Sequence, residues 1–121
     1  MATEAQETAD LIGSDKVEGT PVYDANGERM GSIERVMLEK RSGHVAYAVI
    51  NFGGFLGIGS DYYPIPWASL NYDTSLGGYR TNITAQQLQG APKYAGDSWD
   101  WDDRERGRRV YDYYGAPWNE Y

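Results

Sequence analysis

The sequence predicts a mainly β protein: a small, strongly bent antiparallel β-barrel with a short helical turn near residues 85–89 and an aromatic C-terminal extension. Two observations predict the barrel. Short β-type segments recur at intervals of about 8–12 residues between residues 19 and 84, and turn-forming sequences separate them. Strands and helices do not alternate along the chain, which argues against a parallel α/β sheet.

The composition limits the classes of protein to consider. A chain of 121 residues forms one domain, or one domain with tails, and can bury roughly 65% of its unfolded surface. It has no cysteine, which excludes disulfides, thiolate catalysis and cysteine-ligated metal sites. The N-terminal residues lack the features of a secretory signal, and no apolar run reaches about 18 residues. We therefore expect a cytoplasmic protein without direct membrane insertion.

The formal net charge of −7 is unevenly distributed. Residues 1–15 carry four acids and no base, residues 16–96 carry seven of each, and residues 97–121 carry seven acids and four arginines. The chain therefore has no basic stripe that could neutralise nucleic-acid phosphates or anionic lipid. We expect no nucleic-acid partner.

The first two strands are expected in residues 19–24 and 29–41. Between them, Asn26 and Gly27 favour a two-residue type I′ hairpin turn. The apolar residues of the second strand change parity along the chain, which predicts a β-bulge or bend. Its expected core residues are Ile33, Val36 and Leu38.

The next two strands differ in how they meet their neighbours. Residues 45–52 are apolar on both faces, so another element is expected to cover each side. In the strand that follows, Pro64 and Pro66 lie two residues apart, and their missing N–H groups mark one unpaired or bulged edge. Ile65 and Trp67 point the other way and are expected to form a core pair.

The last strand is expected at residues 79–84. Thr84 and Gln87 have the spacing of a capping box, which predicts the helical turn at residues 85–89. A second helix is expected over roughly residues 100–113, although a glycine within it weakens the helix.

The glycine-rich segment before the prolines resembles a phosphate-binding loop only superficially. Gly54, Gly57 and Gly59 have the reverse of the dinucleotide-binding spacing, and a β-type segment follows where a helix would be required. We therefore predict a wide hairpin and no cofactor. Its tip carries three large apolar side chains, Phe55, Leu56 and Ile58.

No residue pattern predicts an active site. His44, the only histidine, follows a turn and is expected to face solvent. The acidic run near residue 100 breaks the EF-hand pattern at Arg104 and Glu105. We predict no catalytic residue and no metal site.

The C-terminal extension holds 8 of the 17 aromatic residues, counted from Tyr94. We predict three segments: a flexible acidic segment at 1–14, the barrel domain at 15–94 and the extension at 95–121. The aromatic side chains either fold back onto their own barrel or pack on a second subunit, and both interpretations stay open. The residues concerned are Trp99, Trp101 and Tyr111.

Residues 12–94 resemble the PRC-barrel family, whose barrel occurs in the reaction-centre H subunit of purple bacteria and at the C-terminus of a ribosome maturation factor. The matching motifs are Val22-Tyr23-Asp24 with Asn26-Gly27, Gly31, Arg41-Ser42-Gly43 leading into Val45-Ala46-Tyr47, the Gly-Gly-Phe-Leu-Gly segment and Pro66-Trp67. The resemblance implies a bent, closed sheet and a non-catalytic assembly role. The chain is most similar in kind to stand-alone bacterial members, so the partners of the two better-known members are not carried over.

The leading hypothesis is a non-catalytic protein-interaction module that forms a homodimer. Its candidate surface consists of Phe55, Leu56, Ile58, Trp99, Trp101 and Tyr111. The alternative is a small-molecule-binding barrel or an enzyme that uses the barrel mouth near His44 or the tyrosines Tyr62, Tyr63 and Tyr79. A purely structural domain with no specific ligand is the third hypothesis.

Overall fold

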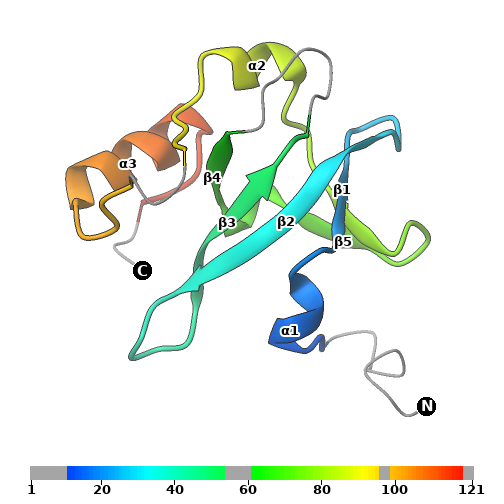
Figure 1. Ribbon diagram of the computed structural model, residues 1–121, viewed down its shortest axis with the longest axis horizontal. Coiled ribbons are helices and arrows are strands. Elements are labelled where there is room, and N and C mark those ends of the chain that lie inside the picture. Colours follow the sequence, from blue (N-terminus) through cyan, green and yellow to red (C-terminus); the bar gives the residue numbers. More distant parts are fainter. Residues whose placement is uncertain (1–10, 54–60, 96–98, 119–121) are drawn as a thin grey trace.

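A computed structural model describes residues 11–53, 61–95 and 99–118 and contains one sheet with the strand order β4-β3-β2-β1-β6-β5 (Figure 1). The strands are β1 (Pro21–Tyr23), β2 (Arg29–Leu38), β3 (Val45–Asn51), β4 (Tyr62–Pro66), β5 (Asn71–Asp73) and β6 (Gly78–Arg80). The helices are α1 (Ser14–Val17), the 3₁₀ turn η3 (Trp67–Ser69), α2 (Ala85–Gln89) and α3 (Arg104–Tyr113). The sequence did not predict α1, η3 or β5.

The sheet is mixed, so the prediction of an antiparallel barrel is wrong in its strand directions. β1 pairs with β6 in parallel, whereas the other neighbours are antiparallel. Followed around the sheet, the pairings give β5 the same sense as β4, and η3 lies between these two strands in the chain. Hydrogen bonds among the described residues do not close the sheet between β4 and β5. Thr81 Oγ1 nevertheless donates to the Ser69 carbonyl at 2.9 Å and ties the end of β6 to η3.

The turn between β1 and β2 differs from the predicted type I′ turn. The Gly27 N–H donates to the Asp24 carbonyl at 3.0 Å, one residue earlier than a turn centred on Asn26 and Gly27 would require. The Asp24 carboxylate accepts the N–H groups of Asn26 and Glu28 at 2.8 and 2.9 Å. This side chain therefore organises the loop, and Gly27 closes it with a positive φ of 82°.

The predicted irregularity in β2 is confirmed by a register shift between Ile33 and Arg35. Ile33 is buried and Val36 packs against the core, as expected. Leu38 is wrong as a core residue, since it is 52% exposed. A second register shift, between Met37 and Leu38, turns the strand at its end.

Strand β3 is buried on both faces, which confirms the prediction for residues 45–52. A main core cluster receives side chains from α1, α2 and five strands, with Ala48 and Ile50 contributed by β3. A second cluster contains Ala46 and Tyr47 from the same strand, packed against α3. The cover that the sequence required on the outer side is therefore the C-terminal helix.

Strand β4 is an edge strand, as its two prolines predicted. Tyr62 exchanges backbone hydrogen bonds with Tyr94 along the outer edge, at 2.8 and 2.9 Å. Pro64 and Pro66 follow at the same parity, so they offer no N–H group to a further strand. Ile65 is buried as predicted, whereas its expected partner Trp67 is only partly buried, because it belongs to η3.

The two helices that the sequence predicted are both present, as α2 and α3. Thr84 and Gln87 form the predicted capping box at the start of α2, and Gly90 caps its end. α3 begins four residues later than the expected segment and ends at the same residue, because the Asp103 side chain accepts the Arg106 N–H and defines the N-terminus of the helix.

Gly31 provides a test of the packing of β2 against β3. A Cβ atom at this position would overlap the Asn51 carbonyl oxygen and lie 2.9 Å from Phe52 Cα, both on the backbone. We expect Gly31→Ala to lower the free energy of unfolding by about 1–3 kcal/mol in urea titrations. Gly90→Ala is the control, because its Cβ meets only the flexible Tyr113 hydroxyl. Equal effects of the two substitutions would contradict the close approach.

Candidate functional site

The C-terminal segment packs on the outer face of the sheet beside β3 and β4, far from α1 (Figure 1). Val110 is fully buried there, and Tyr111 is 7% exposed. The Tyr111 hydroxyl donates to the Ala46 carbonyl of β3 at 2.5 Å, across 65 positions of sequence. This contact combines apolar burial with one directed hydrogen bond, so it sets the position of α3 along β3.

A chain of aromatic rings connects the extension to the sheet. Neighbouring ring centroids lie 5.2–5.9 Å apart, at tilted or edge-to-face angles that stabilise aromatic pairs. In order, the rings are Tyr94, Trp99, Trp101, Tyr47, Tyr111 and Trp118. Trp101 and Tyr111 therefore pack on their own chain, and Trp99 keeps part of its surface exposed.

A basic–aromatic hollow of about 420 Å³ lies beside this chain of rings. Its lining residues are Pro92, Lys93, Tyr94, Trp99, Arg106 and Arg109. The Arg106 guanidinium stacks 4.9 Å from the centre of the Trp99 ring, a cation–π contact that holds both side chains in place.

The cations of the basic–aromatic hollow are paired only loosely. The distance from Lys93 Nζ to a carboxylate oxygen of Asp61 is 3.3 Å. The corresponding nitrogen–oxygen distances are 3.7 Å between Arg109 and Glu105 and 4.0 Å between Arg106 and Asp103, the N-cap residue of α3. The side chains of Lys93 and Arg109 are 48% and 64% exposed. Exposed pairs of this kind contribute about 0–1 kcal/mol each, so an incoming carboxylate can replace them at little cost.

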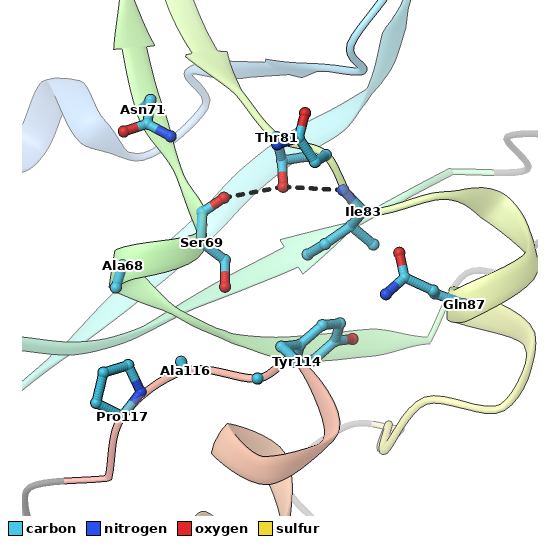
Figure 2. Close-up of a pocket in the computed structure, with 11 residues that line it drawn as sticks. Ala68, Ser69, Asn71, Thr81, Ile83, Gln87, Tyr114, Ala116 and Pro117 are labelled. Carbon is cyan, nitrogen blue, oxygen red and sulfur yellow. Dashed lines mark hydrogen bonds between the residues drawn. The ribbon is translucent and has the colours of Figure 1, made fainter.

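A second hollow, the polar pocket, lies between η3, α2 and the turn that follows α3 (Figure 2). It has a volume of about 310 Å³, and its wall comes from three parts of the chain, within residues 68–71, 81–87 and 114–117. None of its lining residues carries a charge. Thr81 shapes the wall, because its hydroxyl group bonds both the Ser69 carbonyl and the Ile83 N–H.

Tyr114 contributes to the wall of the polar pocket and packs against both core clusters. Its hydroxyl oxygen is buried and has no hydrogen-bond partner in the part of the chain that the structure describes. Burial, with smaller contributions from Tyr113 and Tyr63, raises the pKa of this hydroxyl far above its ordinary value. The group therefore stays protonated and neutral.

Two carboxylates with lowered pKa values lie at turns, outside both hollows. The Ser42 backbone N–H donates to Glu39 at 2.7 Å and lowers the pKa of that carboxyl group. The Ser75 hydroxyl donates to Asp73 at 2.5 Å with the same effect on its pKa. Both carboxylates therefore act as hydrogen-bond acceptors that shape loops.

The four residues of the barrel-mouth alternative lie in different surroundings within the described part of the chain. His44 is exposed at the turn between β2 and β3, and Tyr62 stacks on Tyr94 at the sheet edge. Tyr63 is buried against Phe52, and Tyr79 packs on the ring of Trp67. None of these four candidates lines either hollow.

Three predicted surface residues, Phe55, Leu56 and Ile58, lie outside the described residues. No sequence pattern predicted the polar pocket, because its wall joins three distant segments whose side chains share no motif. The basic–aromatic hollow was partly indicated by the arginines and tryptophans that are interleaved in the C-terminal extension. What sequence reasoning missed there was that Lys93 and Tyr94 complete it.

Within the described ranges, no three His, Cys, Asp or Glu side chains gather as metal ligands would. α3, with 10 residues, is the longest helix in that part of the chain, and no helix there has the length and apolar character of a membrane span.

The fold defines a class: a small domain built on one mixed β-sheet, with short helices at its edges. A family model described as PRC-barrel domain matches residues 9–88, more than half of the chain. The protein belongs to the PRC-barrel domain family, which confirms the resemblance seen in the sequence. No curated protein matches it. The PRC-barrel domain is a recognised module that often takes part in interactions, and the family is generally non-catalytic.

Two tyrosines of the extension form a matched pair for testing its docking. We expect Tyr111→Phe to lower the free energy of unfolding by about 1 kcal/mol, because the Ala46 carbonyl loses its hydrogen bond. Tyr114→Phe removes a buried hydroxyl group without a described partner, so stability should stay the same or rise. Urea denaturation followed by circular dichroism measures both. A larger loss for Tyr114→Phe would contradict the assignment.

Proposed function

We propose that this PRC-barrel domain is a non-catalytic module that binds protein, and that its first partner is another copy of itself. The observation that carries the proposal is the basic–aromatic hollow. Tryptophan, tyrosine and arginine are the residues most enriched at the energetic centres of protein interfaces, and here all three line one depression. Trp99 is held by the Arg106 guanidinium over its ring and by the tilted ring of Tyr94, while part of its surface remains open.

Charge complementarity favours a second copy as the occupant. The chain carries a net charge of −7, yet this hollow presents one lysine and two arginines. The acidic residues 1–15 of another copy, with four acids and no base, match that surface in charge. In a two-fold dimer the same contact forms twice, which doubles its contribution. The apolar residues Phe55, Leu56 and Ile58 remain part of the proposed surface on their sequence alone.

Sedimentation equilibrium tests the proposal with a charge reversal at exposed positions. We expect the Lys93→Glu/Arg109→Glu variant to weaken self-association about 10-fold or more, because like charges then face each other. The matched control is Arg29→Glu/Arg35→Glu, which changes the net charge equally at two exposed arginines of β2. This control should retain nearly all of the association.

Removal of residues 1–10 should weaken self-association about as much as the Lys93→Glu/Arg109→Glu substitutions do. Rising salt concentration should weaken the wild-type dimer and should affect the Lys93→Glu/Arg109→Glu variant less. A wild-type protein that stays monomeric at high micromolar concentration would overturn the proposal. So would equal effects of the two charge-reversed variants.

A further inference from the structure

The polar pocket has the dimensions of a small-molecule site and lies apart from the basic–aromatic hollow. Its volume of about 310 Å³ falls at the lower end of the range typical of ligand pockets. One wall belongs to η3, the start of β5, the segment after β6 and α2, and the other belongs to the turn after α3 (Figure 2). A molecule in this space would contact both.

The wall offers hydrogen-bonding groups that the protein does not use itself. The Ser69 hydroxyl and the Asn82 amide have no hydrogen-bond partner among residues 11–53, 61–95 and 99–118. Figure 2 shows the Ser69 hydroxyl and the Gln87 amide nitrogen pointing toward the space beside the Tyr114 ring. The Gln87 oxygen is already engaged in the capping box, so only its amide nitrogen is available.

The chemistry of the wall selects a neutral ligand. Charged residues make up 24% of the chain, yet none of them lines this pocket, so nothing there would compensate a ligand charge. The lining combines hydroxyl and amide groups with the apolar residues Ile83, Ala116 and Pro117. A compact molecule with several hydroxyl groups on a carbon frame satisfies both kinds of surface.

We propose that the polar pocket binds a small neutral polyhydroxy compound, of the polyol or monosaccharide class, and that binding fastens the C-terminal helix to the domain. The two walls are already joined where the Tyr113 hydroxyl donates to the Gln87 carbonyl. A ligand that bonds both walls binds only the docked arrangement of α3. By linkage, it stabilises that arrangement.

Titration of ¹⁵N-labelled protein with xylitol and with glucose tests the binding. For probes of about ten non-hydrogen atoms we expect a Kd of about 1 mM, with saturable shifts at the backbone amides of Ser69, Asn82 and Gly115. Asn82→Ala should raise the Kd about 10-fold. Gln86→Ala removes an exposed side-chain amide outside the pocket and should change nothing. Glucose 6-phosphate should bind at least 10-fold more weakly than glucose.

Hydrogen exchange supplies a second measurement, directed at the coupling. Saturating xylitol should slow hydrogen exchange of the α3 backbone amides in the wild type. The Asn82→Ala variant at the same xylitol concentration should show a smaller effect, because it reports only the general stabilisation of proteins by polyols. The proposal is overturned if neither probe gives saturable shifts below about 100 mM, if the two alanine variants respond alike, or if α3 exchange does not change. The experiment is repeated in the Lys93→Glu/Arg109→Glu variant, so that failure of self-association and failure of ligand binding are distinguished.

Discussion

Strand β3 is apolar and buried on both faces, and the arrangement of the rest of the protein follows from the need to cover both of them. Its inner side chains belong to the main core, and its outer side carries Tyr47. Full burial of an apolar side chain contributes about 1.5–3 kcal/mol, so an uncovered Tyr47 and Ala46 would lose much of the stability of a small domain. The C-terminal helix provides the cover through Val110 and Tyr111, and the hydrogen bond to the Ala46 carbonyl sets its position.

The docking of this helix also builds both hollows. On one side, α3 brings Arg106 and Arg109 to Tyr94 and forms the basic–aromatic hollow. On the other side, the turn after α3 places Tyr114 and Pro117 opposite the sheet and forms the polar pocket. A segment that first completes the core therefore also creates the surfaces available to partners. Any process that displaces α3 removes both hollows together.

The local features could be predicted because their causes lie within a few residues. The capping box at Thr84 and the proline-marked edge each depend on neighbours in the chain, and both are confirmed. The predicted type of the turn after β1 was wrong because the Asp24 carboxylate competes with the backbone for the N–H groups of the turn. The parallel β1–β6 pair was missed because it joins strands that are far apart in the sequence, and no local pattern encodes the direction in which such strands pair.

The amino-acid sequence was enough to identify a β-rich member of the PRC-barrel family, a strand β3 that needs cover on both faces, and a concentration of aromatic residues near the C-terminus. These properties follow from periodicity, composition and short motifs. The folded molecule was needed to see that Trp101 and Tyr111 of the same chain supply this cover, and that uncharged groups from three segments line a pocket. The reason is physical: contacts across 65 positions depend on how packed surfaces fit, and no local pattern encodes that fit.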